Sequence, residues 1–175
     1  MLRATLRTAL AATIVLAACG EDTEDEPGRS LFAGTMTGVY AAPVAGKAVF
    51  GVTLDDAANG SGFSLVLGEG GAARIALFAY ATPTLRSGTY EIVAPAFDAG
   101  SDTVFTGFLT YNAGASLDSF EIRGGSITLT RTNHNRTSGL FELRAERTSP
   151  ADGAQLTING TFDAGQIPQV FPLPE

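Results

Sequence analysis

The chain contains almost none of the residues that build disulfides and zinc sites. Its 175 residues include one cysteine, one histidine and no tryptophan. A disulfide needs a second cysteine, and a zinc site needs three or four His, Cys or carboxylate ligands, so we expect neither. His134 lies in a polar segment, residues 132–136, between two expected strands. We therefore interpret it as a solvated turn residue and not as the base of a Ser-His-Asp triad.

Motifs for phosphate binding, hydrolysis and calcium binding are also missing. No Gly-rich phosphate loop precedes a helix, and no serine lies in a Gly-x-Ser-x-Gly turn. The segment 55–62 begins like a calcium loop, but Ala57 and Val66 occupy its third and twelfth positions, where oxygen ligands are required. We interpret this segment, and the similar one at 98–102, as turns that hold calcium at most weakly.

Carboxylates from distant strands are the remaining residues that could form a catalytic site. A hydrolase would need residues such as Glu91, Asp118 or Glu121 to converge, and no spacing in the sequence argues for that. We therefore predict that the protein is not an enzyme and has no catalytic residue, metal site or cofactor.

Positive charge is scarce along the chain. There are 11 Lys or Arg against 18 Asp or Glu, which gives a formal net charge of −7. Proteins bind nucleic acids by neutralising phosphates with Lys and Arg. This balance therefore argues against a nucleic-acid partner.

The N-terminal apolar run is too short to span a membrane. Residues 9–18 follow Arg3 and Arg7 and cover about 15 Å as a helix, about half the thickness of a hydrocarbon core. A positive region, a short apolar run and small residues before a cleavage point are typical of a secretory leader. We predict that residues 1–18 are a leader and not an anchor.

The leader ends in a motif around the lone cysteine. Leu16-Ala17-Ala18-Cys19 resembles the lipobox of bacterial lipoproteins. The resemblance implies cleavage before Cys19, a diacylglycerol on its sulfur and an acyl chain, such as palmitate, on its new amine. Two or more acyl chains attach a protein durably to a membrane. Gly20 stands where Asp would mark retention in the inner membrane, which implies the outer membrane; a secreted protein with a leftover thiol is the alternative.

An acidic segment separates the cysteine from the rest of the chain. Residues 21–26 carry five carboxylates, and Pro27-Gly28 follows them. Because like charges repel and no apolar side chain is available for burial, we expect an extended, solvated spacer. The chain thus divides into a leader (1–18), a lipidated Cys19 with its spacer (19–30) and one domain (31–175).

The domain has the two-residue period of β-strands. In the segment 124–130, Ile127 and Leu129 alternate with Ser126, Thr128 and Thr130. This pattern is typical of antiparallel strands with one dry and one wet face, and no segment has a convincing helical stripe with caps. We predict an all-β, single antiparallel domain of about ten strands, arranged as a sandwich or a barrel-like meander. The expected strands are 35–41, 47–54, 63–67, 73–81, 89–94, 104–111, 119–123, 124–130, 141–146 and 156–163.

The C-terminal third carries a second, weaker resemblance. The segments Gly125–Thr130, Ser138–Ala145 and Ile158–Asp163 are similar to the closing strands of uncharacterised bacterial lipoprotein domains, which repeat "GxxxxT", "SGxFxxxA" and "NGxF". These motifs consist of strand and turn residues. The resemblance implies the fold and the lipid anchor, and it implies no activity.

The aromatic residues leave two functions open. Eleven Phe and four Tyr, many of them at inward positions such as Phe50, Phe63 and Phe105, would fill a solid core. The same side chains could instead line a cavity for one small apolar ligand, as in lipocalins. We expect a membrane-tethered envelope lipoprotein that binds a partner protein or serves structurally, with a lipocalin-like carrier as the alternative.

Overall fold

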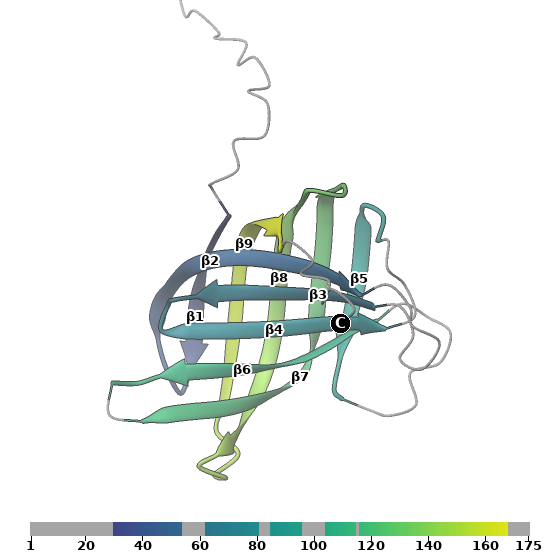
Figure 1. The fold of residues 1–175 in the computed structure, drawn as a ribbon. Coiled ribbons are helices and arrows are strands. Elements are labelled where there is room, and N and C mark those ends of the chain that lie inside the picture. The colour runs from purple at the N-terminus through teal and green to yellow at the C-terminus, as the bar shows by residue number, and fades with distance from the viewer. Residues whose placement is uncertain (1–29, 54–61, 81–84, 96–103, 115, 168–175) are drawn as a thin grey trace, which may run out of the picture.

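The described part of the molecule is built from β-strands alone. The computed structural model describes residues 30–53, 62–80, 85–95, 104–114 and 116–167, and within them it contains nine strands and no helix (Figure 1). The strands are β1 (Leu31–Gly38), β2 (Ala42–Thr53), β3 (Gly62–Glu69), β4 (Ala73–Tyr80), β5 (Gly88–Val93), β6 (Phe105–Asn112), β7 (Leu117–Thr132), β8 (Arg136–Ser149) and β9 (Gln155–Gln166). In this part of the chain, no helix is long and apolar enough to cross a membrane.

The strands form one sheet whose first and last members pair. Their order is β1-β2-β3-β4-β6-β5-β7-β8-β9, and β9 lies antiparallel to β1, with Phe32 opposite Phe162. Most pairs are antiparallel, and the two parallel pairings, of β2 with β9 and of β5 with β6, are short. β5 and β6 are also out of sequence order in the sheet. β6 pairs with β4 and with the first part of β7, while β5 pairs with the second part of β7, from Gly88 opposite Leu129 to Val93 opposite Gly124.

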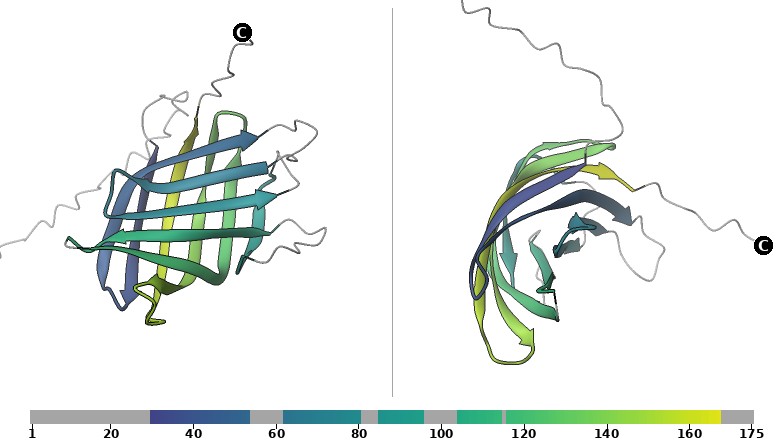
Figure 2. Two further views of the ribbon diagram at one scale, coloured as in Figure 1. Left: turned by 60° about the horizontal axis from the view of Figure 1, so that its bottom comes forward. Right: turned by 90° about the vertical axis from the view of Figure 1, so that its left-hand side faces the viewer.

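The ring of strands is arranged as two layers that cross. In Figure 1, β2, β3, β4 and β6 run across the front, and β8 and β9 run steeply behind them. Figure 2 shows the same crossing from two further directions. Sheets that cross steeply need strands that bend from one layer into the other.

The longest strand bends at a pair of glycines. In β7, the pairing with β8 shifts register between Ile122 and Gly124. Gly125 has a φ of +146°, and a Cβ atom there would lie 2.1 Å from the carbonyl oxygen of Glu142. Only glycine fits so close to β8, and the bulge turns the strand. β7 can therefore pair with β6 on one side of the bend and with β5 on the other.

The inward faces of the two layers meet in one apolar core. Phe141 contacts Phe32 and Phe162 with ring centroids 5.8 and 6.5 Å apart, and Phe63 contacts Phe50 and Phe105 at 5.6 and 6.1 Å. All six rings are buried. The expected inward position of Phe50, Phe63 and Phe105 is therefore confirmed, and Tyr111 packs half-buried against the same core.

The predicted all-β single domain is confirmed, with nine described strands in place of about ten. Segments 119–123 and 124–130 were expected to be separate, but they belong to one strand because the chain bends at Gly124 and Gly125 without a turn. β1 and β2 also begin earlier than expected, at Leu31 and Ala42. β2 includes Pro43 near its start, where a missing N–H donor is tolerated, and this proline hid the strand from pattern analysis.

Two leucines of β8 give a test of the layer arrangement. Leu143 is fully buried and Leu140 is 50% exposed. We expect Leu143→Ala to lower the free energy of unfolding by about 2–5 kcal/mol, because it removes buried methyl groups and leaves a cavity. Leu140→Ala is the matched control and should change it by less than about 0.5 kcal/mol. Urea unfolding followed by circular dichroism measures both; equal effects would contradict the assigned faces.

Candidate functional site

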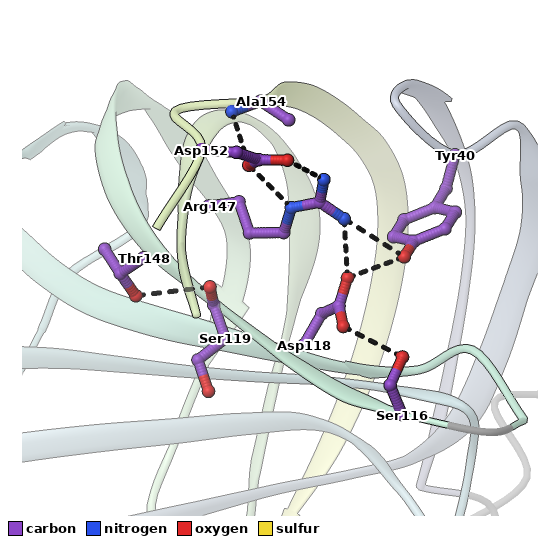
Figure 3. A network of polar contacts seen from close by, with 8 residues as sticks. All are labelled: Tyr40, Ser116, Asp118, Ser119, Arg147, Thr148, Asp152 and Ala154. Carbon is purple, nitrogen blue, oxygen red and sulfur yellow. Dashed lines mark hydrogen bonds and ion pairs between the residues drawn. The ribbon is translucent and has the colours of Figure 1, made fainter. Parts of the chain in front are cut away.

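The most connected polar cluster of the described residues joins three turns at one end of the sheet. It consists of Tyr40, Ser116, Asp118, Arg147 and Asp152, and we call it the Arg147 network (Figure 3). Tyr40 lies between β1 and β2, Ser116 and Asp118 lie where β7 begins, and Arg147 and Asp152 lie at the β8–β9 turn. Each turn therefore supplies at least one member.

Arg147 holds two carboxylates at once. Its Nη1 donates to Oδ2 of Asp118 at 2.7 Å, and its Nε donates to Oδ1 of Asp152 at 2.9 Å. Its Nη2 also pairs with Oδ2 of Asp152, so this second contact is bidentate. The side chain of Asp118 is 3% exposed, that of Arg147 13% and that of Asp152 47%. The network thus runs from the protein interior to the surface.

Neutral donors complete the shell around Asp118. The hydroxyl of Tyr40 donates to Oδ2 at 2.6 Å, and the hydroxyl of Ser116 donates to Oδ1 at 3.1 Å. The ring of Tyr40 packs against Tyr111 and Phe120, with centroids 4.7 and 6.4 Å away. A buried charge is tolerated only when its lone pairs are occupied, and here both oxygens are.

These contacts determine which groups are charged. The hydrogen bond from Tyr40, followed by that from Arg147, lowers the pKa of Asp118. Hydrogen bonds from Arg147 and from the Ala154 amide lower the pKa of Asp152 to about 2, and the bond to Asp118 raises the pKa of Tyr40. At neutral pH both carboxylates are therefore ionised and Tyr40 is neutral. A general base needs a pKa near the working pH, and Asp118 is moved away from it.

The local sequence explains why the β8–β9 turn presents Asp152. The amide of Ala154 donates to Oδ1 of Asp152 at 3.1 Å, and the amide of Arg147 donates to the Ala154 carbonyl at 2.8 Å. Gly153 adopts a φ of +68°, which favours glycine. The turn is therefore fixed by its own bonds and aims Asp152 back at Arg147.

The three carboxylates considered for a hydrolase do not share a face of the sheet. Asp118 is buried beside Phe120 on the inward side of β7, whereas Glu121 is half-buried on the opposite side and pairs with Arg123 at 2.9 Å. Glu91 is exposed on β5. Among the described residues, no three His, Cys, Asp or Glu side chains are grouped closely enough to hold a metal ion.

The remaining candidate residues have simple positions. His134 is exposed in the β7–β8 turn, as expected, beside Asn133, whose side-chain oxygen accepts bonds from the amides of residues 135 and 136. Cys19, the acidic spacer, residues 55–61 of the calcium-like segment and the segment 98–102 lie outside the described residues.

The second candidate functional site is a groove on the outer surface of β4, β6 and β7. It has a volume of about 630 Å³ and is open to solvent. Phe78 and Phe108 form an aromatic pair along it, with ring centroids 6.1 Å apart, and Phe108 is 48% exposed. The lining is otherwise apolar or uncharged, apart from Glu121.

Pattern analysis did not find the Arg147 network. Tyr40, Asp118 and Arg147 are separated by 78 and 29 positions, and their contacts depend on three turns meeting at one end. The sequence marks Asp118 only as one of three distant carboxylates that a hydrolase would need. The one local signal is that Asp118 stands where the two-residue alternation with Phe120 and Ile122 would place an apolar side chain.

Comparison with protein-family models, curated proteins and solved structures finds no match to this chain. The arrangement of its own residues therefore carries the functional argument.

Removing Arg147 tests the network. We expect Arg147→Gln to lower the melting temperature at pH 7 by several degrees, because it leaves the buried Asp118 without its cation. The lowered pKa values of Asp118 and Asp152 stabilise the fold above pH about 4, and this stabilisation is lost as pH falls toward about 2. The variant should therefore lose less stability than the wild type between pH 7 and pH 2.

Arg144→Gln is the matched control for this experiment. Arg144 is an exposed arginine on the same strand and makes no ion pair within the described residues. Thermal melts followed by circular dichroism at both pH values should show the wild-type pH dependence for this control. A parallel acid dependence in the wild type and Arg147→Gln would show that the network does not contribute.

Proposed function

We propose that the chain is a lipid-anchored protein of the bacterial envelope that binds a partner protein through the end of the sheet joined by the Arg147 network. The order of leader, Leu16-Ala17-Ala18-Cys19 motif, acidic spacer and β domain supports the anchor. Gly20 supports the outer membrane as its location. In this proposal the protein is not an enzyme, and the membrane and one envelope protein are its partners.

The observation that carries the proposal is that the described chain enters the domain at the end opposite to the Arg147 network. Ser30 begins the described chain at the far end of β1, where its hydroxyl accepts a bond from the amide of Gly165 at 3.0 Å. Tyr40 follows the other end of β1, which has eight residues and a length of about 26 Å. In Figure 1, β1 starts at the upper end, and the β8–β9 turn lies at the lower end. An anchor at Cys19 would therefore leave the Arg147 network facing away from the bilayer.

The outward end has features of a binding surface. Leu117 is 66% exposed next to Asp118, and Val39 is 37% exposed next to Tyr40. Binding is stronger when the contacting groups are already held in place, because less conformational freedom is lost. The Arg147 network holds the turns that carry both apolar side chains.

A lipocalin-like carrier of a small apolar ligand is the second candidate. The observation that favours it is the closed ring of strands with an aromatic inner face, including Phe50, Phe63 and Phe105. Such a carrier would hold its ligand between the two layers.

The anchor is tested by replacing Cys19. When the full chain is expressed in a bacterium supplied with radiolabelled palmitate, we expect the label and the protein to appear together in the membrane fraction. Cys19→Ala should remove the label and release the protein from that fraction. Gly20→Asp should keep the label and move the protein toward the inner membrane. Unchanged labelling of Cys19→Ala would exclude lipidation at this residue.

The binding surface is tested by site-specific photo-crosslinking in the same cells. A photoreactive residue at position 117 should form a discrete adduct with one envelope protein, and the adduct should weaken when Arg147→Gln is added. Position 140 is the matched control, because Leu140 is also exposed, at 50%, but lies on the outer face of β8. Equal adducts from both positions would argue against the proposed end.

A further inference from the structure

The outer groove lies where the sheet divides into two branches. β6 pairs with β7 from Phe108, opposite Glu121, to Asn112. Before Phe108, the partner of β6 on this side is β5, through the single pair of Phe105 and Ile92. The groove follows this division and is lined by side chains of β4, β6, β7 and β8 together with Pro95. Its walls are strands, so its shape is set by the sheet.

An aromatic surface forms one wall of the groove. Phe108 is 48% exposed although it lies in the middle of a strand, and Phe78 packs beside it. Exposed apolar area is costly in water, so a half-exposed phenylalanine over a groove is a place where a ligand gains by covering it.

The polar part of the lining consists mainly of hydroxyl groups. Thr106, Thr110 and Ser119 contribute them, and of these the hydroxyl oxygen of Thr106 is buried and has no hydrogen-bond partner within the described structure. The one charged lining residue is Glu121, whose carboxylate is paired with Arg123 at 2.9 Å. No Lys or Arg lines the groove. The groove is therefore close to electrically neutral.

This composition distinguishes between classes of ligand. Nucleic acids require cations, which the lining lacks. Protein hot spots are enriched in Trp, Tyr and Arg, and none of the three lines the groove. A sugar ring matches better, because its C–H face can cover an aromatic ring while its hydroxyls bond to threonine, serine and carboxylate oxygens. An open groove accommodates a chain of such rings better than an enclosed small molecule.

We propose that the groove formed by Phe78, Thr106, Phe108, Ser119 and Glu121 binds a neutral saccharide chain. The proposal does not depend on the lipid anchor or on the partner surface at the Arg147 network, which lies among the turns at one end of the sheet. Phe108 supplies the stacking surface, and Glu121 and the hydroxyls orient the sugar.

The test is a titration of the full chain, purified in a detergent without a sugar headgroup. Maltohexaose, cellohexaose and chitohexaose are the probes, and isothermal titration calorimetry measures the affinity. We expect at least one of them to bind, Phe108→Ala to weaken that binding by about tenfold or more, and Thr110→Val to weaken it by a smaller factor. Circular dichroism checks that each variant is folded.

Leu140→Ala is the matched control, since Leu140 is also a half-exposed apolar residue on the outer face. It should leave the affinity unchanged. Absence of binding by all three hexasaccharides overturns the proposal. Equal weakening by Leu140→Ala, or full affinity in Phe108→Ala, shows that the sugar lies elsewhere and overturns the site.

Discussion

The antiparallel pairing of β1 with β9 is the contact on which the rest of the structure depends. It joins the first and last described strands, so the sheet closes into a ring and the backbones of both strands are paired. Exposed strand edges favour aggregation, and closure removes this hazard. The same pairing brings Phe32 opposite Phe162, and both pack with Phe141 in the core. The pairing also brings Ser30 beside Gly165, which fixes where the described chain enters the sheet.

Closing the ring brings three turns together at one end of the sheet. The Arg147 network joins these turns through hydrogen bonds and ion pairs. Burying Asp118 costs desolvation, which is offset because Tyr40, Ser116 and Arg147 occupy its oxygens. Replacing such a network by apolar residues often leaves a protein equally stable, so stability alone gives a weak reason for its presence. A stronger reason is that the network holds three turns in one arrangement. Partner binding at this end would require such a fixed arrangement.

The sequence predicted the strands well where one face is apolar and the other polar. The segment around Ile127 and Leu129 alternates cleanly, and both side chains are buried as expected. It predicted less well where glycine bends a strand without ending it, because Gly124-Gly125 has the composition of a turn. The Arg147 network could not be predicted, since Tyr40 and Arg147 are 107 positions apart and meet only after the ring closes. Local patterns report faces of strands, whereas ring closure and contacts between turns depend on topology.

The position of the anchor in the proposed function limits where a partner can lie. Eleven residue steps separate Cys19 from Ser30, so the spacer reaches at most about 40 Å even when fully extended. β1 adds about 26 Å before the Arg147 network is reached. A partner at that end must therefore lie within about 65 Å of the bilayer. The partner surface and the outer groove carry different chemistry but adjoin each other, because Ser119 and Thr148 of the groove directly follow Asp118 and Arg147 of the network in the sequence.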